Sequence, residues 1–313
     1  MAAAAAMSDA DMGNALWDAA EAGNTGEVTR LLEAGAPANW AHYCFGRTPL
    51  MMAVRCRQLE SMQVLLDRGA DLEAKDSDGY TALIWAARNG KVDVMAMLLD
   101  RGADMEVESK YGYTALSRAV RSGHADAVAL LLDRGADMEA TNMDGYTALM
   151  MAAFSGKVEA VALLLDRGAD LEAKSNDGLT ALMMAGKYGH LESMQVLLDR
   201  GADLEATNMH GYTAFMLAAQ NGHLESMQVL LDRGADLVAQ SIHGYTALTM
   251  AAKNCQVEAV AMLLDRGADL EVRDKDGRSA LDWCRWDICK RALLDAERLQ
   301  RWHRRRLLVT WLR

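Results

Sequence analysis

Histidine and cysteine are the residues of this chain best suited to metal or nucleophilic chemistry. His210 and His243 lie 33 residues apart, and two histidines in this relation could begin a metal site. Neither has a third ligand close to it in the sequence. Cys284 and Cys289 have four residues between them and no second cysteine pair nearby, which does not match a zinc motif. We therefore expect no metal site and no cofactor.

The remaining polar residues do not form a catalytic pattern either. His124, His190 and His223 share one place in a repeating unit, where other units have Lys91, Lys157 and Gln256. The many carboxylates are also copies of a few repeated positions, and the glycines form neither a dinucleotide-binding nor a phosphate-binding motif. We expect that the protein is not an enzyme and has no catalytic residues.

These residues belong to a pattern that recurs every 33 residues. The sequence Gly-Tyr-Thr-Ala-Leu or a close variant begins at Gly79, Gly112, Gly145, Gly178, Gly211 and Gly244, with weaker copies at Gly46 and Gly277. A second motif, Leu-Leu-Asp-Arg-Gly-Ala-Asp, keeps the same interval. Self-similarity of this length indicates stacked repeats, each burying its apolar face against its neighbours.

One repeat, residues 145–177, shows how the pattern would fold. Thr147 precedes a short apolar-periodic stretch and is the expected N-cap of a first helix, which Gly156 ends. A second amphipathic helix is expected from Val158 to about Arg167, followed by Gly168. The polar, turn-rich segment 169–177 would project as an extended hairpin to the next repeat.

The motifs closely resemble those of ankyrin repeats. The nearest copy of the family's opening is Gly46-Arg47-Thr48-Pro49-Leu50, while later units have Ala in place of Pro. The family's histidine is replaced by Met51, Ile84, Ser117, Met150, Met183, Met216 and Thr249. The resemblance implies an all-α repeat solenoid, a stack of helix pairs with projecting β-hairpin fingers.

We predict three segments from the phase of the repeats. Residues 1–11 form a flexible N-terminus, residues 12–295 form the ankyrin-repeat array, and residues 296–313 form a basic tail rich in Trp and Leu. Within the array, residues 12–45 form an N-terminal cap, seven repeats start at 46, 79, 112, 145, 178, 211 and 244, and a degenerate C-terminal cap starts at 277.

The resemblance also implies where a partner would bind, namely on a concave surface made by the finger tips and the exposed side of each first helix. Tyrosine and arginine are enriched in binding hot spots. The predicted partner-binding residues on this surface are Tyr80, Arg88, Tyr113, Arg121, Met143, Tyr146, Phe154, Lys187, Tyr188, Met209, Tyr212 and Tyr245. An alternative is that each tyrosine is a structural strut against the next finger. The row containing Arg88, Arg121 and Phe154 is the preferred candidate.

The distribution of charge along the chain restricts the class of partner that the protein is expected to bind. The chain has a net charge of −11, and residues 285–313 have nine basic and three acidic residues, so the remainder has −17. An acidic body disfavours nucleic-acid binding. A basic, aromatic surface on such a body favours a protein or peptide with acidic and apolar groups, and the protein is expected to be a monomer.

The leading prediction is a non-catalytic scaffold or adaptor for protein–protein interaction. One alternative is a peripheral membrane or cytoskeletal tether, with membrane contact only through residues 298–313, where Arg304, Arg305 and Arg306 lie among Trp and Leu. Another alternative is a regulatory subunit of an enzyme complex. Five cysteines without a paired pattern favour a cytoplasmic location, or alternatively a nuclear one.

Overall fold

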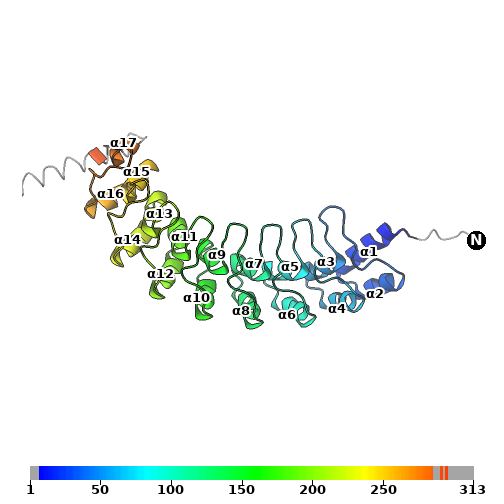
Figure 1. Cartoon of the computed structure of the whole chain (residues 1–313). Helices are drawn as coiled ribbons and strands as arrows, with labels where there is room; N and C mark the ends of the chain where they lie inside the picture. The colour runs from blue at the N-terminus through cyan, green and yellow to red at the C-terminus, as the bar shows by residue number, and fades with distance from the viewer. Residues whose placement is uncertain (1–6, 285–289, 292, 295–313) are drawn as a thin grey trace, which may run out of the picture. The chain divides into compact units, whose positions relative to one another are not determined.

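The computed structural model describes residues 7–284, 290, 291, 293 and 294. Its helices are drawn in Figure 1. They are α1 (Asp9–Ala22), α2 (Thr25–Glu33), α3 (Pro49–Cys56), α4 (Leu59–Asp67), α5 (Ala82–Arg88), α6 (Val92–Asp100), α7 (Ala115–Ser122), α8 (Ala125–Asp133), α9 (Ala148–Phe154), α10 (Val158–Asp166), α11 (Ala181–Tyr188), α12 (Leu191–Asp199), α13 (Ala214–Asn221), α14 (Leu224–Asp232), α15 (Ala247–Lys253), α16 (Val257–Asp265) and α17 (Ala280–Trp283).

Each helix pair begins where the sequence predicts. The Met150 N–H donates to the Thr147 hydroxyl oxygen at 3.4 Å, which confirms Thr147 as the cap of α9. The second helix of the same repeat starts at Val158, as expected. Glycine between the two helices adopts a positive φ, 64° at Gly156, a conformation that costs little without a side chain.

The N-terminal boundary differs from the prediction. Helix α1 begins at Asp9, three residues before the expected start of the cap at 12, because Ser8 caps it by accepting from the Asp11 N–H at 3.2 Å. Residues 9–11 are therefore helical rather than flexible. The predicted flexibility of residues 1–6 lies outside the described residues.

The projecting fingers are built from turns, and no described residue belongs to a β-strand. Each finger still closes on itself, as in the bond from the Asp76 N–H to the Tyr80 carbonyl oxygen at 3.1 Å. Neighbouring fingers are also joined through their backbones, since the Lys110 N–H donates to the Asp78 carbonyl oxygen at 3.0 Å. This contact requires a glycine at position 79, where φ is 79° and an added Cβ would lie 2.6 Å from the Lys110 nitrogen.

The repeats divide into two compact units. Unit 1 contains residues 1–151 and 166–169, and unit 2 contains residues 152–165 and 170–313. Within unit 1, the first helices α1, α3, α5 and α7 form one row and the second helices α2, α4, α6 and α8 form another, with the fingers on the side of the first row (Figure 1). In unit 2, α11, α13 and α15 pack in succession and each also packs on its own second helix.

The interior of both units is apolar. The residues that replace the family's histidine are all buried, with Ile84 and Met150 each 1 % exposed. In the described part of the chain no helix is both long and apolar enough to cross a bilayer.

Candidate partner-binding surface

Arginine and aromatic side chains alternate along the finger side of the first helices in unit 1. We call them the arginine–aromatic row, which consists of Arg47, Trp85, Arg88, Tyr80, Arg118, Tyr113 and Arg121. They come from the residue after the finger glycine and from the exposed edges of α5 and α7. The repeat therefore places these side chains at fixed intervals along one face.

Arg118 lies at the centre of the row. Its Cζ is 3.9 Å from the centroid of the Tyr113 ring and 4.8 Å from that of the Tyr80 ring. Cation–π contacts of this kind form within about 6 Å of a ring centroid. The guanidinium of one repeat thus lies between the tyrosine of its own repeat and the tyrosine of the preceding one.

The other arginines extend the row in both directions. The Cζ of Arg88 lies 5.3 Å from the Trp85 ring centroid, and that of Arg47 lies 4.6 Å from the same centroid. Arg121 donates from Nη1 to the Tyr113 hydroxyl oxygen at 2.9 Å. The Trp85 ring is fixed in turn by its Nε1–H, which donates to Asp76 Oδ2 at 2.9 Å.

The charges of this row are not neutralised within the described structure. Arg47, Arg88, Arg118 and Arg121 form no ion pair with any described residue. Burial lowers the pKa of Arg118, and the positive charges of Arg121 and Arg88 act in the same direction. By contrast Arg55, one repeat earlier on α3, is paired with Glu21. The row is therefore a concentrated positive region on an acidic protein.

One predicted contact residue must be corrected. Tyr80 is 5 % exposed, because its ring meets Trp85 edge-on with centroids 5.8 Å apart and is covered by Arg118. It cannot offer its ring to a partner, and the alternative reading as a structural strut applies to it. Tyr113 and Tyr146, at the same place in later repeats, are half-buried.

The finger tips of unit 1 add exposed apolar surface next to these charges. Met143 is 67 % and Tyr111 58 % exposed, and they belong to consecutive fingers joined by a bond from the Met143 N–H to the Tyr111 carbonyl oxygen at 3.3 Å. Exposed apolar side chains beside cations can contact a partner with both acidic and apolar groups.

The other predicted residues belong to unit 2. Phe154 and Tyr188 meet edge-on with ring centroids 4.5 Å apart, and the Lys187 Nζ lies 5.4 Å from the Tyr188 centroid. Met209 is 57 % exposed at a finger tip, whereas Tyr212 and Tyr245 are half-buried. A shorter group of cations and aromatic rings lies at the end of unit 2, where the Lys253 Nζ is 5.0 Å from the Tyr245 ring centroid and 4.5 Å from that of Trp283.

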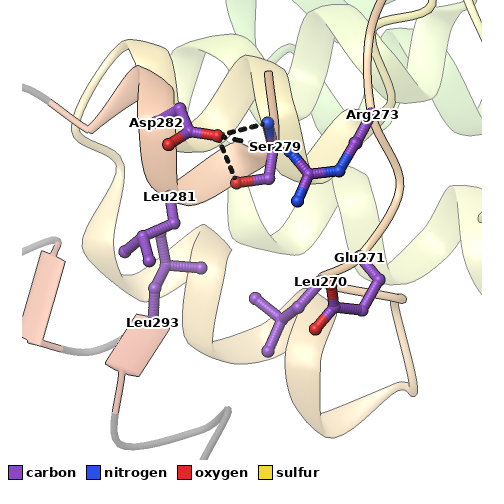
Figure 2. A pocket seen from close by; sticks show the side chains of 7 residues that line it. All are labelled: Leu270, Glu271, Arg273, Ser279, Leu281, Asp282 and Leu293. Atoms are coloured by element: carbon purple, nitrogen blue, oxygen red, sulfur yellow. Dashed lines mark hydrogen bonds and ion pairs between the residues drawn. The ribbon is translucent and has the colours of Figure 1, made fainter. Parts of the chain in front are cut away.

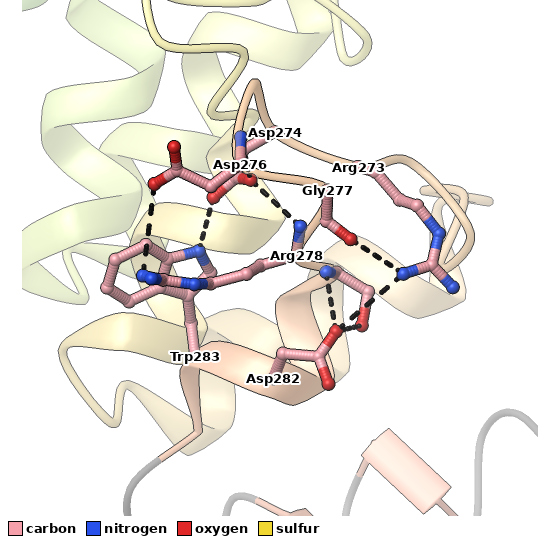
Figure 3. Close-up of polar contacts among 8 residues, drawn as sticks. Arg273, Asp274, Asp276, Gly277, Arg278, Asp282 and Trp283 are labelled. Atoms are coloured by element: carbon pink, nitrogen blue, oxygen red, sulfur yellow. Dashed lines mark hydrogen bonds and ion pairs between the residues drawn. The ribbon is translucent and has the colours of Figure 1, made fainter.

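The last repeat of unit 2 contains a related tryptophan cluster, shown in Figure 3. Trp283 donates from Nε1 to Asp274 Oδ2 at 2.6 Å, as Trp85 does to Asp76. Burial acts to raise the pKa of Asp274, but hydrogen bonds from the Arg278 N–H, Trp283 and Asp276 hold it below its ordinary value. Arg278 also lies 3.9 Å from Asp276, so its charge, unlike that of Arg118, has a carboxylate partner.

A pocket of about 250 Å³ lies beside this cluster (Figure 2). Its polar residues bind one another, since Asp282 accepts from both the N–H and the hydroxyl of Ser279 at 2.8 and 2.9 Å. Arg273 donates to the Gly277 carbonyl oxygen at 2.7 Å. Leu293, buried at 1 % exposure, also lines the pocket.

Three features were not found by reasoning from the sequence. Arg118 was missed because its position reads as part of the buried apolar pattern. Glu73, at the start of a finger, accepts from the Asp104 N–H of the next repeat at 2.8 Å, a contact that the repeat pattern does not reveal. His124, His190 and His223 each contact a carbonyl oxygen of the preceding repeat, at 2.9 to 3.2 Å. The basic tail, residues 296–313, lies outside the described residues.

Comparison with protein families agrees with this architecture. A family model described as "Ankyrin repeats (3 copies)" matches residues 72–142, 135–208 and 215–292, and one described as "Ankyrin repeats (many copies)" matches residues 31–86. No individual curated protein matches the chain. Ankyrin repeats generally serve as protein–protein interaction modules. Because the matches extend over most of its length, the chain belongs to the ankyrin-repeat family.

Proposed function

We propose that the protein is a non-catalytic scaffold or adaptor that binds another protein through the finger side of unit 1. The observation that supports this most is the arginine–aromatic row, in which four arginines without carboxylate partners lie on a protein whose net charge is −11. Cation–π contacts hold these arginines in place, but no ion pair with a described residue neutralises their charge. This charge provides a local attraction for an acidic partner.

The partner segment would combine acidic and apolar groups. Acidic side chains would lie against the row, and apolar side chains would cover Tyr111 and Met143 at the adjacent finger tips. An extended peptide suits such a surface because it can contact successive repeats at regular intervals. We place the protein in the cytoplasm, which fits the free thiols of Cys44, Cys56 and Cys255, and imaging of the tagged protein would test this.

Selection of random displayed peptides against the purified full-length chain tests the proposal. We expect the selected peptides to be enriched in Asp or Glu together with apolar residues. The Arg88→Ala/Arg121→Ala variant should weaken their binding at least tenfold, about 1.4 kcal/mol. Failure to select any peptide, or equal binding by this variant, would contradict the proposal.

The chain offers a matched control on the opposite side of unit 1. Arg101 and Arg134, on the second helices, pair with Asp67 and Asp100 at 3.1 and 3.0 Å. The Arg101→Ala/Arg134→Ala variant changes the net charge by the same amount away from the row, so it should bind the selected peptides as the wild type does. Exposed pairs of this kind contribute little to stability, so the control should fold normally.

A further inference from the structure

Arg118 departs from the repeat pattern in a way that packing does not explain. The same position of the first helix is apolar in the other repeats, where Met52, Met151, Met184, Leu217 and Met250 are all buried. Trp85 and Trp283 occupy it in the two remaining repeats. A flexible methionine would fill this place without a charge, as it does elsewhere in the chain.

The environment of Arg118 leaves its hydrogen-bonding capacity unused. Its Nε is buried and has no hydrogen-bond partner in the described structure. Its guanidinium lies over the Tyr80 and Tyr113 rings, with Cζ 4.8 and 3.9 Å from their centroids, and among the described residues no ion pair neutralises it. A buried donor without an acceptor is costly, and a charged donor more so.

Two further cations lie close enough to Arg118 for their charges to act on it. Arg88 lies over the Tyr80 ring at 6.0 Å and Arg121 over the Tyr113 ring at 5.7 Å, so both share a ring with Arg118. Arginine presents a rigid fork of donors that matches the oxygens of a carboxylate or a phosphate. Three such forks without a counter-charge form an arrangement complementary to an oxyanion.

We propose that Arg118 is the specificity-determining residue of the partner surface and that it binds an oxyanion on a side chain of the partner, flanked by Arg88 and Arg121. The proposal rests on the proposed function and deepens it, since it names the chemical group that the surface selects. The oxyanion is the carboxylate of an Asp or Glu side chain, and a phosphate in its place is an outcome that the phosphopeptide described below would reveal. Tyr80 and Tyr113 hold the guanidinium in place for it.

Arg118→Met tests this directly, because methionine is the residue that the chain itself uses at this position. The variant should keep the melting temperature at or above that of the wild type, since a buried unpartnered charge has been removed. It should weaken binding of a selected acidic peptide at least tenfold. Arg118→Lys, which keeps the charge but loses the fork, should bind with intermediate affinity.

A double-mutant cycle identifies the group that Arg118 contacts. Each acidic residue of the peptide is changed to its amide and measured against wild type and Arg118→Met. For one acidic residue of the peptide, the change to the amide should weaken binding to the wild type but leave binding to Arg118→Met unchanged. Replacing that residue with phosphoserine distinguishes the two oxyanions. The wild type should bind the phosphopeptide more weakly than the carboxylate peptide, and tighter binding would show that the surface selects phosphate instead.

Nuclear magnetic resonance of the wild type gives a readout that needs no variant. The Arg118 Nε–H signal should shift on addition of the acidic peptide, because an oxyanion bound at the guanidinium changes the electrostatic environment of this N–H. If the peptide binds equally well to wild type and Arg118→Met, and this signal does not move, the inference is wrong while the proposed function stands. If no peptide binds the wild type at all, both fail.

Discussion

At the residue scale, glutamates at the start of most fingers connect one repeat to the next, as Glu73 and Glu106 do. Asn39 accepts from the Asp71 N–H at 2.7 Å, and Glu73 accepts from the Asp104 N–H at 2.8 Å, so the glutamate makes the same contact that asparagine makes in the first finger. Burial raises the pKa of Glu73 and Glu106, although the hydrogen bonds from the next repeat oppose the shift. The hydrogen bond of each glutamate therefore stabilises the contact between two repeats, whereas its partly buried negative charge opposes folding.

Removing that charge should stabilise the protein in a pH-dependent way. When folding raises the pKa of a carboxyl, that carboxyl contributes fully to the free energy of unfolding at pH values below its unfolded-state pKa. The contribution is lost as the pH rises through the folded-state pKa, because the carboxyl then ionises in the folded protein. Glu73→Gln/Glu106→Gln keeps the acceptor oxygen without the charge. We expect its melting temperature at pH 7 to exceed that of the wild type by roughly 1–2 °C.

The same comparison at about pH 4, near the ordinary glutamate pKa, should show no difference, because the wild-type carboxyls are then largely protonated. Glu108→Gln, an exposed finger residue of the same unit, is the control and should have no effect at either pH. A double variant that is less stable than the wild type at pH 7 would contradict this account of the glutamates.

Single residues also show where sequence reasoning reaches its limit. The spacing of Tyr80 places it correctly beside the finger, but its burial depends on Trp85 and Arg118, which other repeats lack at those places. Arg118 occupies a position that the periodicity marks as core, and only the packing of two tyrosines shows that its charge stays near the surface. The 33-residue repeat pattern does not predict which side chains of adjacent repeats contact one another.

At the element scale, local rules predict most of what is observed. Threonine caps and the glycines after each helix place the helix pairs correctly, as at Thr147 and Gly156. The fingers were expected as β-hairpins but are turns in the described chain, because each finger bonds to its neighbour at single points such as Lys110 to Asp78. That spacing allows no continuous strand ladder.

Two glycines with positive φ provide the clearest test at this scale, Gly79 in a finger and Gly102 after helix α6. Gly79 and Gly102 have similar φ values, 79° and 88°, but an added Cβ meets the Lys110 backbone at 2.6 Å in the first case and nothing within 4 Å in the second. Gly102→Ala should cost about 1–2 kcal/mol through backbone strain alone. Gly79→Ala should cost about 1–3 kcal/mol more, because it also forces the fingers apart.

Urea unfolding of the two variants measures the difference in stability. Hydrogen exchange at the Lys110 amide, which is bonded to Asp78, should accelerate in Gly79→Ala and stay near the wild-type rate in Gly102→Ala. Equal losses of stability in the two variants would show that the close approach of neighbouring fingers is not the reason for a glycine at position 79.

At the scale of the whole molecule, the charge of the chain and the charge of the proposed surface have opposite signs. A net charge of −11 repels an acidic partner at long range, whereas the arginine–aromatic row attracts it on contact. Added salt screens both effects. The sign of the salt dependence therefore tells which one governs binding.

The most direct test of the account is the affinity of full-length protein for a selected acidic peptide as a function of salt. Between about 0.01 M and about 0.15 M NaCl the Debye length falls from about 30 Å to about 8 Å. We predict that binding weakens over this range in the wild type and weakens less in Arg118→Met. Binding that strengthens with salt, or that is indifferent to it, would contradict the claim that the arginine–aromatic row receives the partner.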